Sequence, residues 1–387
     1  MHSRLFVMVI ALVAVAGILF AQLRPVYAGE QSSVSGYKVL DPIRHGSLTV
    51  FPVVAPKSYS TGEFLTLDEG LRSGEVVVTE YGNITGLVRR RPVHVQRESA
   101  QVNTLVLINN SKRPLLLLAG EIVAGGKQDR VIGKDRIVPP ESDPVDLSVF
   151  CVEPGRWVAT SEHFGTSGMN YAPVPSGSGI GKGNDTVGGA VMAQPSVRAK
   201  AMADKDQNQV WAEVRKQQQS MAVVVAAESP ASPSAEQIRS TSSYARVMEN
   251  KDVKERVEEV AKPIEQNYQS LIKQLRDRKA VGVVVAVNGR IIWSDIFAST
   301  ELLEKYWPKL VRSYASEAVV TRAKGGEASL AQAQEFLADM EGRRETIESE
   351  PGIYRHTEVS GDGFKAFALT SLLPKTGFDV HVAKMAE

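Results

Sequence analysis

One stretch of the sequence combines a glycine turn with closely spaced polar side chains. In "LLLLAGEIVAGGKQDRVIGKDRIVPP" (Leu115–Pro140), an apolar run leads into Gly125 and Gly126. The polar residues that follow at once are Lys127, Gln128, Asp129 and Arg130. Backbone N–H groups turned inward by glycines, together with cationic side chains, can hold a phosphate or a carboxylate. The competing interpretation is a tight hairpin turn whose polar tip is solvated, as most glycine turns are.

The spacing in this stretch excludes a Walker loop, which requires G-x-x-x-x-G-K-[ST]. When Lys127 is aligned with the Walker lysine, Glu121 falls on the first glycine and Gln128 on the magnesium-binding hydroxyl. Glu121 and Gln128 remain candidate residues for a site other than a Walker loop. A carboxylate such as Glu121 is a general base where a cleft raises its pKa.

A second polar segment, "CVEPGRW" (Cys151–Trp157), follows about twenty residues later. A guanidinium and an indole can sandwich a planar anion-bearing group, so Arg156 and Trp157 are candidate binding residues. Glu153 is a candidate carboxylate for the same site. The alternative is a structural ion pair between Glu153 and Arg156, since arginine pairs bidentately with carboxylates.

Other catalytic and metal-binding patterns are weak. Cys151 and His163 are the residue types of a thiolate–imidazole pair, but the apolar context "LSVFCV" predicts a buried, unreactive thiol instead. The six histidines have no H-x-x-x-H or H-E-x-x-H spacing, and there is no G-x-S-x-G elbow. "GSGIGKG" does not fit the dinucleotide fingerprint. We therefore predict no metal site and no cofactor.

Charge and composition narrow the class of partner. Lys and Arg total 45 against 44 for Asp and Glu, so there is no large excess of positive charge to bind a nucleic-acid backbone. Of the 387 residues, 43% are hydrophobic, which is typical of globular proteins. The chain is long enough for two or three packed units.

The N-terminus has the pattern of a signal peptide. Arg4 is followed by the apolar run Leu5–Phe20 and by the small-residue cleavage pattern Val26–Ala28. We predict removal of residues 1–28 and export to the periplasm or the medium. If the segment is retained, it is the chain's one membrane anchor, although an apolar run of this length is short for a span. With one cysteine, the exported protein has no internal disulfide.

The pattern of residues 35–164 is that of short β-strands. The strands are expected at residues 47–54, 75–81, 87–96, 104–110 and 146–152. β-branched residues separated by Gly, Pro and Asn favour a sandwich or an irregular barrel.

Three further segments follow. Residues 165–197 are rich in Gly, Ser and Pro and predict a loop or linker. Residues 198–279 are helical, with an apolar stripe from Val253 to Leu275, and Pro263 must kink this helix or begin a second one. Residues 280–387 predict an α+β unit that packs with the rest of the chain, and Asn288-Gly289 marks a β-hairpin. The fold class is therefore α+β.

These motifs together resemble a known family. The order "GEIVAGGKQDR", "CVEPGRW", "QVWAEV" and "GVVVAVNGRIIWSDIF" is similar to a bacterial and archaeal domain of unknown function, the ARPP domain. Its name records an association with ADP-ribosylglycohydrolase and rhodanese-phosphatase superfamily proteins. The matching positions are Gly120, Glu121, Gly125, Gln128, Arg130, Cys151, Glu153, Gly155, Arg156 and Trp157. Asp129 departs from the pattern, since the family more often has asparagine there.

The resemblance implies that Glu121, Gln128, Arg130, Glu153, Arg156 and Trp157 converge on one site. We expect an exported, non-catalytic binding or interaction module, with an anionic small molecule or polymer at the Gly125–Arg130 turn. One alternative is a hydrolase of a phosphate- or glycosyl-linked, ADP-ribose-like substrate, with Glu121 or Glu153 as general base and Arg130 stabilising charge. The other is a structural envelope protein that assembles through its helical stripe.

Overall fold

The hairpin predicted at Asn288-Gly289 lies inside a nine-stranded antiparallel sheet in the computed structural model. It joins β13 (Lys279–Val287) to β14 (Arg290–Phe297). Asn288 and Gly289 have φ angles of 50° and 76°, so both take the positive φ that a type I′ turn needs. The hairpin is confirmed.

The structure describes residues 36–80, 104–155, 161, 163–166, 191–275, 278–321 and 325–387. Several predictions fall outside these residues. They are the signal segment 1–28, the strand at 87–96, most of the segment 165–197, and the candidate residues Arg156 and Trp157.

The nine-stranded sheet combines strands from both ends of the described chain. Its order is β1-β3-β13-β14-β18-β17-β16-β15, with β2 also paired to β3. The N-terminal members are β1 (Lys38–Val39), β2 (Ile43–His45) and β3 (Leu48–Ala55). The C-terminal members are β15 (Arg343–Glu350), β16 (Tyr354–Gly361), β17 (Phe364–Ser371) and β18 (Asp379–Ala386). Strands from residues 38–55 therefore share one sheet with strands from residues 279–386. The predicted division of the chain into domains stays a prediction.

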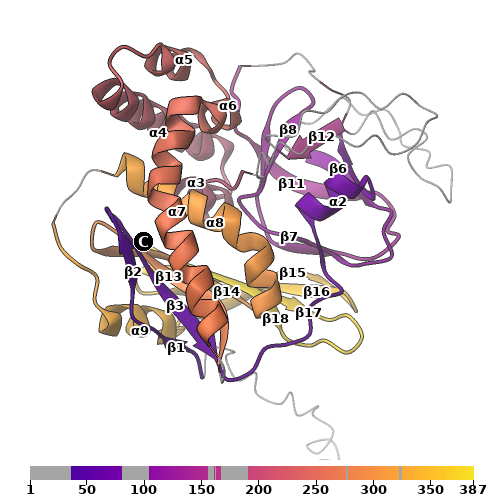
Figure 1. Cartoon of the computed structure of the whole chain (residues 1–387). Coiled ribbons are helices and arrows are strands. Elements are labelled where there is room, and N and C mark those ends of the chain that lie inside the picture. Colours follow the sequence, from indigo (N-terminus) through magenta and orange to yellow (C-terminus); the bar gives the residue numbers. More distant parts are fainter. Residues whose placement is uncertain are drawn as a thin grey trace, which may run out of the picture. The chain divides into compact units, whose positions relative to one another are not determined.

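Helices cover both faces of this sheet (Figure 1). On one face, α7 (Lys251–Gln274) and α8 (Thr300–Val320) pack against each other and against β3 and β13. Their apolar residues form one core with Val283, Val285 and Leu369. On the other face, α9 (Leu330–Ala338) packs against β1 and β14.

The apolar stripe of α7 belongs to this core. Val253, Val257, Ile264 and Tyr268 are all buried, so the stripe is core packing. Pro263 lies within a single helix and does not begin a second one. Pro263 has no N–H to donate to the carbonyl of Glu259. Glu259 is exposed, so water can satisfy that carbonyl.

The β-rich region contains a closed barrel. Of the two predicted alternatives, a sandwich and an irregular barrel, the barrel is therefore confirmed. Its order is β11-β6-β5-β12-β8-β9. The strands are β5 (Val76–Thr79), β6 (Thr104–Asn109), β8 (Ile122–Gly125), β9 (Arg130–Ile132), β11 (Val145–Cys151) and β12 (His163–Thr166). Leu105, Leu107, Val149 and Phe164 fill its core. A small sheet has the order β10 (Arg136–Val138)-β7 (Leu115–Leu117)-β4 (Leu65–Thr66), and β4 leads directly into α2 (Leu67–Ser73).

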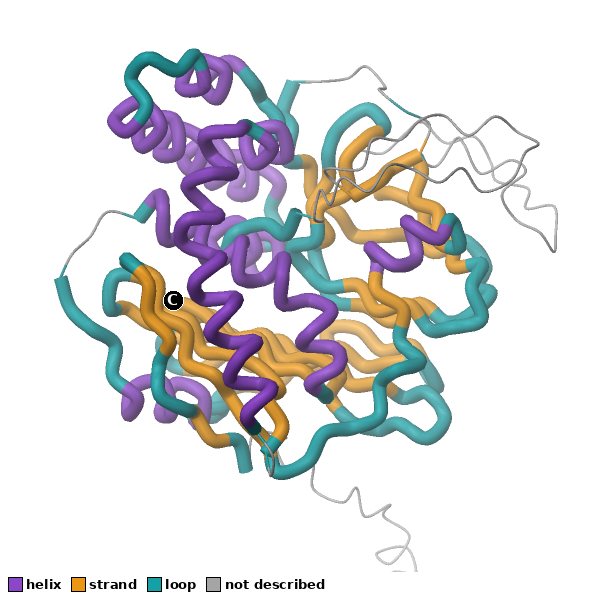
Figure 2. The backbone as a smooth tube through the Cα atoms, in the orientation of Figure 1, coloured by secondary structure: helices purple, strands orange, loops and turns teal. Residues whose placement is uncertain are grey.

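The central segment is helical, as predicted (Figure 2). It contains α3 (Pro195–Ala199), a π-helix (Lys200–Asp204), α4 (Gln207–Glu228), α5 (Ser234–Ser240) and α6 (Tyr244–Glu249). None of the helices in the described ranges combines the length and apolarity that a membrane crossing needs. With strands at both ends and helices between them, the fold is α+β.

Candidate functional site

The predicted glycine turn connects β8 to β9, and its backbone amides point inward. The N–H of Gly125 donates to Asp129 Oδ1 (3.1 Å) and that of Gly126 to Ser161 Oγ (3.1 Å). The N–H of Lys127 donates to Glu80 Oε1 (2.8 Å). The three amides therefore donate to three different side chains of the chain itself.

The two motif segments meet where β9 pairs with β11. Arg130 lies opposite Cys151, and the Val152 N–H donates to the Asp129 carbonyl (3.0 Å). Glu153 Oε2 accepts from the Asp129 N–H (3.1 Å). The structure thus brings Asp129, Arg130 and Glu153 together, and all three are buried.

Asp129, which replaces the family's more frequent asparagine, uses both carboxylate oxygens. Oδ1 accepts from Gly125, and Oδ2 accepts from the Ser243 hydroxyl at the N-terminus of α6 (2.7 Å). An asparagine has one oxygen to accept from Gly125, and its NH2 group can only donate to the Ser243 hydroxyl, so the charge-assisted bond from Ser243 would be replaced by a neutral one of opposite direction.

Gln128 is fully buried, at 0% exposure. Neither its side-chain oxygen nor its nitrogen has a hydrogen-bond partner within the described ranges. Buried amides are nearly always paired, so this side chain is an exception. Lys127 differs, because its side chain is 40% exposed and forms an ion pair with Glu80 (3.7 Å).

Glu121 lies in a separate buried ion cluster and does not join Arg130 and Glu153. Its Oε1 forms an ion pair with Lys309 of α8, which also pairs with Asp68 (2.8 Å). Oε2 accepts from the Leu118 N–H (2.7 Å). Burial raises the pKa of Glu121, and the Lys309 charge opposes that shift.

The interpretation of Cys151 as a buried thiol is confirmed. Burial raises the pKa of the thiol. The backbone of Cys151 exchanges two hydrogen bonds with the Gln207 side chain, at 2.8 and 2.9 Å. Its contacts therefore join β11 to α4.

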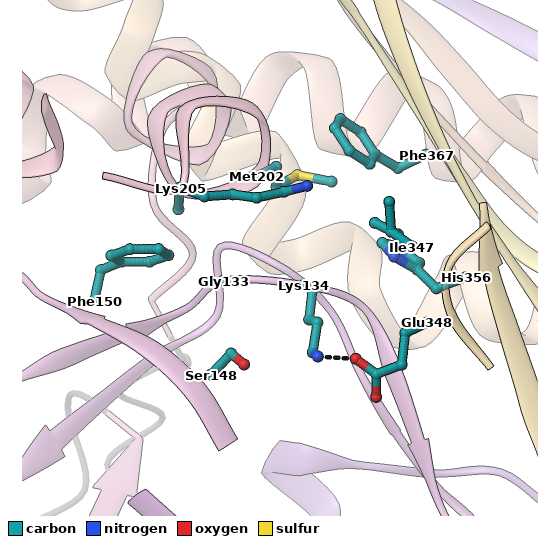
Figure 3. A pocket seen from close by; sticks show the side chains of 11 residues that line it. Gly133, Lys134, Ser148, Phe150, Met202, Lys205, Ile347, Glu348, His356 and Phe367 are labelled. Carbon is teal, nitrogen blue, oxygen red and sulfur yellow. Dashed lines mark hydrogen bonds and ion pairs between the residues drawn. The ribbon is translucent and has the colours of Figure 1, made fainter. Parts of the chain in front are cut away.

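A cavity of about 260 Å³ lies between the barrel, the π-helix and the outer strands of the nine-stranded sheet (Figure 3). The barrel side contributes Gly133, Lys134, Ser148 and Phe150; the π-helix side contributes Ala201, Met202 and Lys205; and the sheet contributes Ile347, Glu348, His356 and Phe367. None of these residues was a candidate from the sequence.

Three backbone irregularities converge on this cavity. The π-helix carries Ala201 and Met202, and Lys205 after it is left-handed, with φ 53° and ψ 31°. A register shift between β15 and β16 makes a bulge that contains Ile347. π-Helical turns, non-glycine residues at positive φ and bulges are all enriched at functional sites.

His356 is the most unusual side chain of the cavity. It is 1% exposed, and in the part of the chain that the structure describes, both of its ring nitrogens lack a hydrogen-bond partner. Burial lowers the pKa of His356 to about 4, with Lys134 and Lys205 acting in the same direction and Asp135 opposing them. The ring is therefore neutral at pH 7, with one donor and one acceptor unused.

Two lysines lie at the cavity. Lys134 contacts Glu348 in an ion pair, drawn in Figure 3, and Arg136 lies 3.9 Å from the same carboxylate. Lys205 pairs with Glu358 (3.1 Å). Burial, Arg136 and Lys205 lower the pKa of Lys134.

A fully buried ion network lies behind His356. His381 Nδ1 lies 2.6 Å from Asp135 Oδ2, and His381 Nε2 lies 3.1 Å from Asp295 Oδ1. Arg198 forms a bidentate pair with Asp295. Gly120 is required here, because it has φ 96° and a Cβ at that position would lie 2.5 Å from Arg198 Cγ. Gly120 of the motif therefore supports the core.

Among the described side chains, no group of three or more His, Cys, Asp or Glu residues is arranged to hold a metal ion. The cavity's chemistry is therefore that of two ammonium groups, one carboxylate, one hydroxyl and a neutral imidazole on an apolar wall. Such a wall with a few convergent polar groups is the usual composition of a small-molecule site.

The family model of the ARG and Rhodanese-Phosphatase-superfamily-associated Protein domain matches residues 36–384. The chain belongs to this family, as the motifs predicted. No curated protein and no solved structure matches the chain.

Proposed function

We propose that this chain is a non-catalytic binding protein for a small anionic molecule, and that the molecule occupies the cavity beside Lys134, Lys205 and His356. The observation that carries the proposal is the unpartnered, buried imidazole of His356 in a wall that also holds two ammonium groups. A buried donor or acceptor without a partner costs about 1–3 kcal/mol, which a ligand can recover.

The charges around the cavity favour an anion. Lys134 shares Glu348 with Arg136, and Arg136 also pairs with Glu350. Lys205 shares Glu358 with Lys365. Four cations face three carboxylates, which leaves one positive charge. A ligand with a single negative charge neutralises it.

The backbone supports the same location. A left-handed lysine costs about 1–2 kcal/mol relative to right-handed backbone. Lys205 takes this conformation as the C-cap of the π-helix, where its N–H donates to the Lys200 carbonyl (3.1 Å), and left-handed non-glycine residues are also concentrated at ligand sites. At the glycine turn, in contrast, oxygens of the chain already accept the amide bonds.

The size of the cavity favours a small ligand over a nucleotide-like one. Pockets for drug-sized ligands measure roughly 300–1,000 Å³, and this cavity measures about 260 Å³. The hydrolase alternative also requires a carboxylate of raised pKa that faces a cleft. Glu121 has a raised pKa, but its oxygens are bound by Lys309 and Leu118 in the core.

The signal-peptide pattern supports export, so we propose a periplasmic or secreted binding protein. N-terminal sequencing of the protein recovered from outside the cytoplasm should begin at Gly29. A protein that retains Met1 and stays with the membrane would contradict cleavage.

Titration calorimetry with benzoate, acetate and inorganic phosphate tests the binding function, with neutral benzamide as the uncharged comparison. We expect benzoate to bind with a Kd below about 1 mM and benzamide to bind more weakly. Lys134→Gln and Lys205→Gln should each weaken benzoate binding about tenfold, because each removes a charged donor.

Lys251→Gln is the matched control. Lys251 is also a lysine in an ion pair, but it is 84% exposed at the start of α7. This variant should bind as the wild type does. If none of the three anions binds, or if all three lysine variants bind equally well, the proposed function is wrong.

A further inference from the structure

The cavity has a charged mouth and an apolar inner end. At the mouth, the side chain of Lys205 is 49% exposed and those of Lys134 and Glu348 are each 27% exposed. At the inner end, His356, Met202 and Phe367 are at most 2% exposed. A ligand that matches this gradient would place its apolar part at the inner end and its charge at the mouth.

The inner end favours a flat ligand body. The rings of His356 and Phe367 are nearly parallel, with 15° between their planes and 6.0 Å between their centroids. Phe150 of the barrel lies on the other side of the cavity from Phe367 (Figure 3). Aromatic and thioether side chains contact planar rings favourably.

Among the cavity residues that the structure describes, His356 is the one polar side chain at the inner end. A purely apolar ligand would leave both of its ring nitrogens without a partner. A hydroxyl group can donate to one nitrogen or accept from the other, whichever faces it.

We propose that His356 selects ligands that carry a hydroxyl group, so that the ligand is a small monoanion with a flat apolar body and a hydroxyl distant from its charge. This inference rests on the proposed function and identifies the ligand class of the same cavity. His356 is then a specificity-determining residue. A buried water that bonds to His356 is the competing occupant, since such waters satisfy buried polar groups.

The experiment compares benzoate with 2-, 3- and 4-hydroxybenzoate in calorimetric titrations of the full chain. We expect at least one isomer to bind about tenfold more tightly than benzoate, because it supplies the missing hydrogen bond. His356→Phe should abolish this preference, so that no hydroxybenzoate binds this variant more tightly than benzoate does. His356→Gln, which keeps a donor and an acceptor, should retain part of the preference.

The outcomes separate the two proposals. Benzoate binding with no hydroxyl preference in the wild type, or a preference that survives in His356→Phe, overturns the present inference and leaves the anion site intact. Failure of benzoate and of every isomer to bind overturns both. Thermal unfolding of each variant establishes that it is folded before it is titrated.

Discussion

Asp295 on β14 accepts two hydrogen bonds from the guanidinium of Arg198, each 2.9 Å long, and neither side chain is exposed to solvent. The hydroxyl of Tyr314 and Nε2 of His381 reach the same carboxylate. The guanidinium also lies 4.5 Å from the ring centroid of Trp293. This cluster joins α3, α8, β14 and β18 through buried side chains.

Removing Asp295 should therefore strongly destabilise the fold. In Asp295→Ala, the buried Arg198 loses its counter-charge, and we expect the free energy of unfolding to fall by about 3–5 kcal/mol. Urea denaturation followed by circular dichroism measures this change. The control is Asp204→Ala, which breaks a partly exposed ion pair with Lys200 and should cost less than about 1 kcal/mol. Similar losses in the two variants would contradict the role of the buried pair.

The stability of the protein should also depend on pH through His381. Burial opposes protonation, but Asp135 and Asp295 outweigh it and raise the pKa of His381 to about 9. The unfolded value is about 6.5. A raised folded pKa gives stability that is complete below the unfolded pKa and is lost as the pH rises through about 9.

His381→Gln should lack this loss between pH 7 and pH 10, and the wild type should lose on the order of 1–3 kcal/mol more than the variant. The comparison with the variant is needed because Lys384 acts in the opposite sense. Burial lowers the pKa of Lys384 to about 8. The cost of burying its charge therefore disappears as the pH rises through the range in which His381 loses its proton. Parallel stability curves for the two proteins would show that His381 is not the responsible group.

The elements that local chemistry determines were predicted from the sequence. Asn288-Gly289 specifies its hairpin because few residue pairs tolerate two positive φ angles. The stripe of α7 was predicted as core because its period is helical. β15 and β16 were missed, since β15 reads "RRETIESE" and is an exposed edge strand without apolar alternation.

The candidate site was predicted only in part, because local sequence patterns do not predict contacts between residues that are far apart in the chain. The motif segments meet as expected through Asp129 and Glu153. Glu121 was predicted to join them but pairs with Lys309, 188 positions away. The cavity combines residues 133–150, 201–205 and 347–367. None of its lining residues was a candidate from the sequence.

Asp129→Asn tests whether the departure from the family pattern is structural. Asparagine can accept from Gly125 and donate to the Ser243 hydroxyl, which exchanges a charge-assisted bond for a neutral one, so we expect a loss of about 1 kcal/mol in the free energy of unfolding. Thermal and urea unfolding measure it. Ser243→Ala should cost much less in the Asp129→Asn background than in the wild type, because the shared bond is already weakened. Additive losses would mean that the two side chains are not coupled.

Gln128→Met distinguishes an unpaired amide from one that serves a ligand. Methionine has a similar length and no polar group to desolvate, so we expect it to increase the free energy of unfolding by about 1 kcal/mol. Gln217→Met is the matched control, because Gln217 is a buried glutamine whose amide donates to Ser196 and Glu213. That variant should be destabilised. If Gln128→Met is destabilised to the same extent, then the Gln128 amide has a partner in the protein as purified.

Lys205→Gly removes both the backbone strain at the cavity and the charge of the lysine. Glycine adopts φ 53° without steric cost, and the ion pair with Glu358 is half-exposed and contributes little. We therefore expect the free energy of unfolding to stay constant or to rise by up to about 1 kcal/mol, while benzoate binds about tenfold more weakly. Glu141→Gly is the control, since Glu141 is also left-handed (φ 48°) but does not line the cavity. It should relieve similar strain without changing affinity. A Lys205→Gly variant that binds benzoate as tightly as the wild type would mean that the strained lysine does not serve the ligand.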